Sequence, residues 1–404
     1  MNNKVLVVED SRTYQNYLRQ QLSDAGYQVY IAGSIAEGKQ LLKQHPQFRF
    51  AVLDYCLPDG QDGEVIDLFL SQGHKVVVLT ATFSEQARQR FIDKGVVDYL
   101  LKDSLASVSY LIPLAKRLLN NSQHHALVVD DSATVRHYVA QLLEHQYIKT
   151  TLAQDGKEAL ELLERHPDIS FIITDHDMPV MDGITMIRAI RQFRDRNSLA
   201  ILGLSGSDNN NLTAKFLKSG ANDFLTKPFN QEEFYCRVHQ MLDMKEATDE
   251  LYKLANQDAL TGLWNRRFLF SLPLDSNQQR QIAMIDIDHF KQVNDVYGHE
   301  AGDLAIKTIA EILKLCFPGE VVVRFGGEEF CVKSIAPSDD FFQRLENMRQ
   351  RIAQTPINYQ QSIINITVSI GLCNVEENLE QQIRIADDRL YLAKSAGRNQ
   401  TIAS

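Results

Sequence analysis

The sequence predicts an α/β protein with two doubly wound parallel-sheet domains, a helical stalk and a C-terminal α/β domain of a different kind. Three observations predict this organisation: a segment that is repeated within the first 245 residues, short apolar runs that alternate with amphipathic ones, and an unbroken helical pattern before the last third of the chain. With 404 residues, 44% of them hydrophobic and 23% charged, the chain has the composition of a multidomain globular protein.

A duplication organises the first 245 residues. KVLVVEDSRT at 4–13 resembles ALVVDDSATV at 126–135, and Asp54 recurs 121 residues later as Asp175. Because this period is too long for a solenoid repeat, it indicates a duplicated domain. We place the two copies at 1–121 and 122–244.

Each copy alternates strands with helices. In the first copy the helical patterns at 14–22 and 36–44 have apolar residues three or four positions apart. The strand-like runs are 5–8, 50–54, 76–80 and 97–101. Fully apolar strands that alternate with helices are typical of a parallel sheet covered on both faces, whose ligands bind at the carboxyl ends of the strands.

Acidic residues mark these carboxyl ends. Glu9 and Asp10 end the first strand and Asp54 ends a later one, and each copy adds a hydroxyl residue and a lysine, here Thr80 and Lys102. The equivalents in the second copy are Asp130, Asp131, Asp175, Ser205 and Lys227. A single strand-end acid is usually only solvated, but a set that occurs twice with the same spacing indicates a site. Three carboxylates suit Mg²⁺, and the hydroxyl and the ammonium suit a phosphoryl group on the middle aspartate.

Charge, apolar runs and cysteines exclude several classes of protein. Lys and Arg number 42 and Asp and Glu number 52, so the formal charge is −10, which argues against a nucleic-acid binder. No run approaches the roughly 18 apolar residues of a membrane span, and Glu9 and Asp10 interrupt the first apolar run, so we expect neither membrane insertion nor a signal peptide. Five scattered cysteines without a CxxC pair favour a reducing, cytoplasmic location.

The segment 231–257 predicts a helical stalk that overlaps the end of the second copy. It contains no Gly or Pro. Its apolar residues at heptad spacing are Phe234, Met241, Met244, Thr248, Leu251 and Ala255. This thin seam favours pairing with a partner chain, and the alternative is a helix that packs on its own domain.

The C-terminal domain, 256–404, contains an apolar strand with acids at 282–290 and a hairpin at 321–333 that turns at Gly-Gly. Asp286 lies in the apolar strand, where a charge needs a cation or a donor, and Glu328 lies at the hairpin tip. If the two strands are neighbours, both carboxylates face one point and suit Mg²⁺, or Mn²⁺ in its place, together with substrate phosphates. The alternative for each acid is simple solvation. The sequence has no P-loop and no HExxH motif.

Both N-terminal copies resemble the receiver domains of response regulators, which have a flavodoxin-like fold. The resemblance implies phosphorylation of Asp54 and Asp175 by a cognate histidine kinase or phosphotransfer protein. It implies Mg²⁺ ligands at Glu9, Asp10, Asp130 and Asp131. It also implies switch residues at Thr80, Lys102, Ser205 and Lys227 and at the aromatic positions Tyr99 and Phe224. The second copy has Pro228 after its lysine as the family usually does, whereas the first has Asp103, and Leu57 replaces the more usual methionine before Pro58.

Residues 256–404 resemble the GGDEF family of diguanylate cyclases. The resemblance rests on DALTGLWNRR, DIDHFKQVND, YGHEAGD, RFGGEEF, TVSIGL and ADDRLYLAKSAGRN, in which Gly326-Gly327-Glu328-Glu329-Phe330 is the signature. Two receivers followed by this domain are similar to the response-regulator diguanylate cyclases of the PleD type. The family fold is a palm-like α/β domain with a mainly antiparallel sheet.

The resemblance implies condensation of two GTP molecules to cyclic di-GMP and pyrophosphate by a homodimer. Asp286, the carbonyl of Ile287 and Glu328 would hold Mg²⁺, and Glu328 would accept the proton of the 3′-hydroxyl. Asn294 and Asp303 would bind guanine. His299, Lys394 and Arg398 would contact the rest of the substrate. The family's inhibitory RxxD motif is missing, because residues 317–320 are FPGE. The alternatives are a degenerate nucleotide-binding GGDEF module and a phosphorelay scaffold without cyclase activity.

Overall fold

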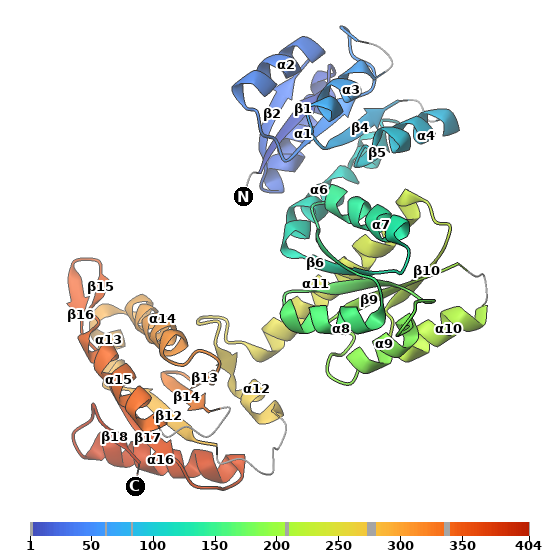
Figure 1. The fold of residues 1–404 in the computed structure, drawn as a ribbon. Helices are drawn as coiled ribbons and strands as arrows, with labels where there is room; N and C mark the ends of the chain where they lie inside the picture. The colour runs from blue at the N-terminus through green and yellow to red at the C-terminus, as the bar shows by residue number, and fades with distance from the viewer. Residues whose placement is uncertain are drawn as a thin grey trace. The chain divides into compact units, whose positions relative to one another are not determined.

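The computed structural model describes residues 3–60, 63–81, 84–206, 210–272, 280–334 and 340–403 (Figure 1). The chain divides into two compact units, Met1–Ala247 and Thr248–Ser404. Both copies of the duplication lie in the first unit. None of the helices in the described part of the chain combines the length and the apolar composition that crossing a bilayer requires.

The first copy, from β1 to α6, is a five-stranded parallel sheet with strand order β2-β1-β3-β4-β5. Its strands are β1 Lys4–Val8, β2 Gln28–Ala32, β3 Phe50–Asp54, β4 Val76–Thr80 and β5 Asp98–Leu101. Its helices are α1 Arg12–Asp24, α2 Ile35–Gln44, α3 Glu64–Ser71, α4 Glu85–Lys94, α5 Leu105–Val108 and α6 Leu111–Asn120, with a 3₁₀ turn at Asn121–Gln123. Separate apolar clusters lie on the two faces of the sheet, one with α1 and α6 and the other with α2, α3 and α4.

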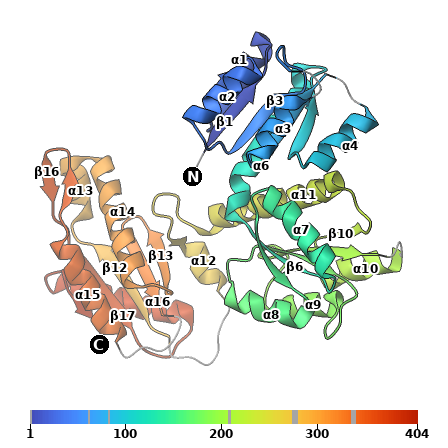
Figure 2. The same cartoon turned by 45° about the horizontal axis from the view of Figure 1, so that its top comes forward.

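The second copy, from β6 to α11, is again a sheet covered by helices (Figure 2). Its sheet is parallel, with strand order β7-β6-β8-β9-β10. Its strands are β6 His125–Val129, β7 Lys149–Ala153, β8 Phe171–Asp175, β9 Ala200–Ser205 and β10 Asp223–Thr226. Its helices are α7 Ala133–His145, α8 Gly156–Arg165, α9 Gly183–Ile190, α10 Asn210–Ser219 and α11 Gln231–Asn256. The predicted pair of doubly wound, flavodoxin-like folds is therefore confirmed.

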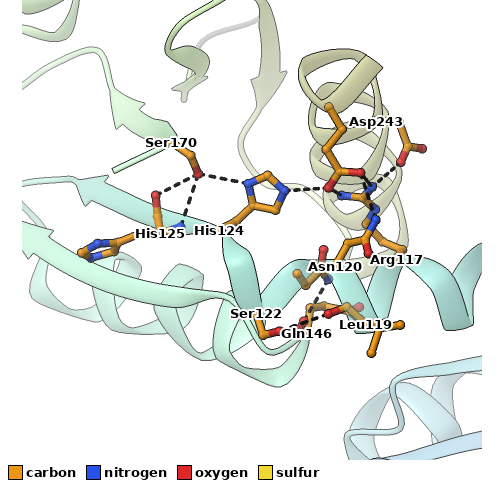
Figure 3. Close-up of polar contacts among 11 residues, drawn as sticks. Arg117, Leu119, Asn120, Ser122, His124, His125, Gln146, Ser170 and Asp243 are labelled. Carbon is orange, nitrogen blue, oxygen red and sulfur yellow. Dashed lines mark hydrogen bonds and ion pairs between the residues drawn. The ribbon is translucent and has the colours of Figure 1, made fainter. Parts of the chain in front are cut away.

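Side chains of the first copy contact α11 and the linker before β6. Arg88 forms two hydrogen bonds of 3.0 Å with Glu232 through its Nε. Arg117 donates to the Glu246 carboxylate at 2.8 and 2.6 Å. Asp243 also pairs with Arg117, and His124 bridges Glu246 and Ser170 (Figure 3). The helix that closes the second copy is therefore bound to both copies.

The expectation that all the heptad residues of α11 face a partner chain is wrong for the first half of the helix. Phe234 and Met241, which we assigned to a seam between chains, are 0% and 7% exposed because they belong to the core of the second copy. Met244 and Leu251, by contrast, are 69% and 66% exposed. The first half of the helix is thus a domain helix, and only its second half presents apolar side chains to solvent.

The second unit contains a six-stranded mixed sheet with order β11-β13-β14-β12-β17-β18, whose central pairs are antiparallel. The strands of this sheet are β11 Trp264–Asn265, β12 Ile282–Ile287, β13 Val321–Gly326, β14 Glu329–Lys333, β17 Val368–Cys373 and β18 Thr401–Ile402, and β15 Ile357–Tyr359 and β16 Ser362–Ile364 form a separate two-stranded sheet. The helices of this unit are α12 Arg266–Ser271, α13 Phe290–Tyr297, α14 His299–Cys316, α15 Phe341–Gln354 and α16 Leu379–Ser395. The predicted hairpin at 321–333 is confirmed as β13 and β14.

Alternation along β12 decides which helix each side chain of that strand meets. Ala283, Ile285 and Ile287 pack into the core with α14 and α15. Ile282 and Met284 pack into the smaller core with α12 and α16. Because successive side chains of a strand point to opposite faces, Asp286 belongs to the α16 face.

Candidate functional site

The acids of the first copy meet at one edge of its sheet. Parallel pairing of β1 with β3 brings Glu9, Asp10 and Asp54 together, and their carboxylate oxygens lie within 4.8 Å of one another. Lys102 Nζ donates to Asp54 at 2.6 Å and to Glu9 at 3.0 and 3.1 Å. Burial raises the pKa of Glu9, and the negative charge of Asp54 raises it further. One lysine against three carboxylates leaves an excess of negative charge, which fits a divalent cation.

The second copy repeats the contacts of the lysine. Lys227 Nζ donates to Asp130 at 2.7 Å and to Asp175 at 2.6 Å. Burial raises the pKa of Asp175, which Lys227 opposes. The main-chain N–H of Ser132 donates to Asp130, as that of Ser11 donates to Glu9 in the first copy. Asp131 lies at the same sheet edge and is exposed to solvent.

The hydroxyl residues lie beside the lysines. Thr80 and Ser205 are 3% and 2% exposed at the ends of β4 and β9. Their carbonyl oxygens accept hydrogen bonds from the N–H groups of Lys102 and Lys227 at 2.8 and 2.7 Å. Asp103, which replaces the family's proline, therefore does not prevent Lys102 from reaching the acid cluster.

The two aromatic switch positions have different surroundings. Tyr99 donates its hydroxyl proton to Glu232 on α11 at 3.0 Å. Phe224 has its ring 5.5 Å from the ring of Phe216 within the second copy. In the first copy, therefore, the aromatic residue contacts the helix that closes the second copy.

Asp286 is the centre of the candidate cyclase site. It is 6% exposed, and Lys394 on α16 pairs with it at 2.8 Å. Burial raises the pKa of Asp286, Lys394 opposes this shift, and the negative charges of Glu328 and Asp288 add to it. The two strands are neighbours as predicted, because Asp286 in β12 pairs in register with Glu329 in β14, the residue after Glu328. Ile287 follows Asp286 directly, and its side chain is buried.

The Gly-Gly turn that carries Glu328 is bound to the start of the domain. Arg324 donates to the carbonyl of Gly327 at 3.0 and 2.8 Å and to the Asp258 carboxylate at 3.0 and 3.1 Å. Gly327 has a φ of 38°, a conformation that favours glycine. Arg324 therefore holds the turn in place.

The proposed guanine-binding residues lie where α13 meets α14. A Cβ on Gly302 would lie 2.0 Å from Asn294 Oδ1, so the two helices approach closely there. Asp303 follows Gly302 and is exposed, and His299 is the first residue of α14. The structure thus brings Asn294 and Asp303 to one helix junction.

Lys394 and Arg398 lie in different parts of the folded domain and have different surroundings. Lys394 is in the last turn of α16 and contacts Asp286. Arg398 is exposed in the following loop with a φ of 62°. No contact joins Arg398 to Asp286 or Glu328 among the residues that the structure describes.

The role of Asp288 was not apparent from the sequence. Its carboxylate is 4% exposed and accepts hydrogen bonds from Thr367 and Ser369, both at 2.6 Å, and from the N–H of Asn399 at 3.0 Å. It therefore joins the end of β12 to β17 and to the loop after α16. The two acids in IAMIDIDHF were the available signal, but the donors lie about 80 to 110 residues away in sequence.

The chain is similar to known protein families and solved structures. Residues 5–108 and 126–239 match the response regulator receiver domain, and residues 255–400 match the diguanylate cyclase, GGDEF domain. Response regulator PleD of Caulobacter vibrioides is 25% identical over 459 residues, an alignment that covers 100% of this chain and 99% of PleD. Diguanylate cyclase VdcA of Vibrio cholerae is 38% identical over 170 residues, which cover 39% of this chain and 50% of VdcA. The structure of a "probable two-component system response regulator/GGDEF domain protein" is 38% identical with a TM-score of 0.56, and covers 61% of this chain and 100% of that one.

Two receiver folds with complete acid–lysine sets, followed by a GGDEF domain, define a response regulator with an enzymatic output domain. The chain belongs to the response-regulator diguanylate cyclases of the PleD type.

Proposed function

We propose that the protein is a phosphorylation-regulated enzyme that condenses two GTP molecules to cyclic di-GMP and pyrophosphate. The observation that carries the proposal is the buried Asp286, which pairs with Lys394 and lies in register with Glu329, the residue after Glu328. The relatives named as diguanylate cyclases support the reaction type.

In the proposed reaction, Asp286, the carbonyl of Ile287 and Glu328 hold Mg²⁺, or Mn²⁺, which supplies charge neutralisation at the GTP phosphates. Glu328 accepts the proton of the 3′-hydroxyl. Asn294 and Asp303 bind guanine, whose N1–H and N2–H₂ donors suit a carboxylate. His299, Lys394 and Arg398 contact the substrate, and the cations offset triphosphate charge.

The proposed regulation acts through dimerisation. A histidine kinase or phosphotransfer protein phosphorylates Asp54, Asp175 or both, with Mg²⁺ held by the neighbouring acids. The modified protein forms a homodimer in which two cyclase domains face each other, since each domain binds one GTP. The proposed division of the chain is 1–121 and 122–244 for the receivers, 231–257 for the stalk and 256–404 for the cyclase.

Turnover of GTP by the purified full-length protein tests the enzymatic part. We expect cyclic di-GMP and pyrophosphate, and we expect Asp286→Asn and Glu328→Gln each to lower turnover by about 100-fold or more. Glu311→Gln is the control, because Glu311 is a surface acid on α14 that pairs with Lys314. GTP binding without product in the unaltered protein would instead favour a nucleotide-binding module, and the absence of both would favour a scaffold.

Beryllofluoride, a mimic of the phosphoryl group, tests the regulatory part. It should increase both dimerisation and turnover, and Asp54→Asn and Asp175→Asn, singly and together, should identify the receiver that responds. If the mimic changes neither dimerisation nor turnover, regulation by phosphorylation is wrong. Since the RxxD motif is absent, we expect no strong product inhibition through that surface when cyclic di-GMP is added.

A further inference from the structure

A cavity of about 340 Å³ lies between the first copy and α11. Its walls come from α4 and β5 of the first copy, from the end of α7, and from one face of α11. Residues with polar groups in these walls include Asp98, Tyr99, Tyr110, Gln146, Tyr235 and His239. The volume falls within the range of about 300–1,000 Å³ that is usual for small-molecule sites, which often form at domain junctions.

Two buried polar atoms of this cavity have no hydrogen-bond partner among the described residues. Gln146 is 1% exposed, and its Oε1 has no donor, although its Nε2 lies 3.5 Å from the carbonyl of Val97. The Nε2 atom of His239 is likewise buried and unpaired. Because buried polar atoms are nearly always satisfied, these two favour a ligand with a polar group over a wholly apolar one.

The duplication supplies an internal comparison for Asp98. Its equivalent in the second copy, Asp223, accepts the N–H of the next residue at 2.8 Å and also pairs with Arg237 at 3.1 Å. Asp98 accepts the N–H of Tyr99 at 2.8 Å, but no cation pairs with it in the part of the chain that the structure describes. The nearby Arg88 is bonded to Glu232 and Glu85.

The pKa of Asp98 is that of a carboxylate without a cationic partner among the described residues. Burial raises the pKa of Asp98 to about 6, and the negative charge of Glu232 contributes to the shift. The described residues that line the cavity include two carboxylates and no Lys or Arg. A ligand with a positive charge would therefore be favoured over a neutral or an anionic one.

We propose that this cavity binds a small organic amine, whose protonated nitrogen pairs with Asp98 and whose apolar body lies among the tyrosine rings and aliphatic side chains of the walls. Gln146 Oε1 accepts a second N–H of the ligand. The aliphatic part of the wall comes from Ile92, Val96, Val97 and Leu100. Tyr99, Tyr110 and Tyr235 provide aromatic faces, which attract cations.

A ligand in this position contacts the first copy through Asp98 and the second through Gln146 and α11. It therefore binds only when the two copies are in contact and stabilises that contact by linkage. The site is independent of the cyclase reaction, since none of its residues belongs to the proposed GTP site.

Calorimetric titration of the full-length protein tests the proposal with three probes that share an indole body. Tryptamine carries a protonated amine, tryptophol is neutral, and indole-3-acetate is an anion. We expect tryptamine to bind with a dissociation constant of about 1 mM or lower and the other two to bind at least about tenfold more weakly. Asp98→Asn and Gln146→Leu should each weaken tryptamine binding about tenfold or more, and Asp93→Asn, an exposed acid on α4, should not.

Each other outcome overturns the proposal. Absence of tryptamine binding would mean that water alone satisfies the buried atoms. Equal binding of tryptophol would contradict a cation site, and unchanged binding by Asp98→Asn would place the amine elsewhere. Thermal unfolding of both variants verifies that they are folded, so that lost binding is not lost structure.

Discussion

Two aspartates at the end of β12, Asp286 and Asp288, illustrate how local surroundings separate chemistry from structure. Asp288 accepts three hydrogen bonds from neutral donors. Asp286 has Lys394 as its cationic partner and Glu328 as a negative neighbour. A carboxylate that is saturated with neutral donors is suited to hold the fold, whereas one with unbalanced charge is suited to bind a metal ion.

Asp288→Asn should therefore lower stability and Asp286→Asn should lower turnover. The amide at position 288 would turn an N–H group toward at least one of three donors, and the free energy of unfolding should fall by about 1–3 kcal/mol in urea titration. Asp286→Asn is the matched control, with a smaller loss of stability and a larger loss of activity. The reverse pattern would contradict this division of roles.

The contact of Gly302 with Asn294 gives a second prediction at this scale. In Gly302→Ala, the new Cβ would meet Asn294 Oδ1, which lies 2.0 Å from the Cβ position, so Asn294 should be displaced and the KM for GTP should rise. Asn294→Ala removes the amide, and the double variant should then be no worse than Asn294→Ala alone, as a double-mutant cycle measures. Additive losses would mean that Gly302 acts through the helix packing and not through Asn294.

At the scale of elements, α11 presents different faces to the two copies. Phe234, Val238 and Leu242 enter the core of the second copy. Glu232 and Glu246, two heptads apart, bind Arg88 and Arg117 of the first copy. Because residues seven apart lie on one side of a helix, a single helix serves both interfaces.

The junction at Glu246 should contribute strongly to the contact between the copies. Arg117 has a side chain that is 7% exposed, so Glu246→Ala would leave a buried guanidinium whose remaining carboxylate partner among the described residues is Asp243 (Figure 3). Loss of one partner of a buried ion pair costs about 3–5 kcal/mol, and we expect a value near the lower end because Asp243 remains. Denaturant unfolding measures the change.

Asp243→Ala is the matched control, since this residue pairs with the same arginine but its side chain is 66% exposed. Its substitution should cost about 1 kcal/mol or less. If both substitutions lower the free energy of unfolding equally, the burial of the carboxylate does not determine its contribution to this junction.

At the scale of the whole molecule, the second half of α11 has several large apolar side chains that are mostly exposed. Met244 and Leu251 are seven residues apart and mostly exposed, as are Tyr252 and Leu254 at 51% and 67%. An exposed apolar stripe on a helix is typical of a surface that pairs with another chain. This stripe supports the proposed dimer.

The variant Met244→Ser/Leu251→Ser should weaken self-association of the beryllofluoride-treated protein by about tenfold or more, as measured by sedimentation equilibrium. Leu315→Ser is the control, because Leu315 is similarly exposed, at 64%, but belongs to α14 and not to α11. If the double variant associates as strongly as the unaltered protein, the stalk is not part of the dimer interface.

Much of the fold was predictable, and the exceptions have physical causes. The apolar strands such as β3 and β4 were found because both faces of a parallel sheet are buried. The edge strands β2 and β7 were not identified, since QVYIA and KTTLA mix exposed and buried positions. The exposed half of α11 was found by its heptads, but its buried half was assigned to the wrong partner.

By itself the sequence determined the duplication, the strand-end acids and the lysines beside them, because parallel strands that end at one edge bring such residues together wherever the pattern recurs. Only the tertiary structure decided that Asp288 holds the fold, that α11 joins both copies, and that Asp98 lacks a cation partner among the described residues where Asp223 has Arg237. These features depend on contacts between residues that are far apart in sequence or on different helix faces, and a local pattern does not encode the partner that a charge will meet when the chain has folded.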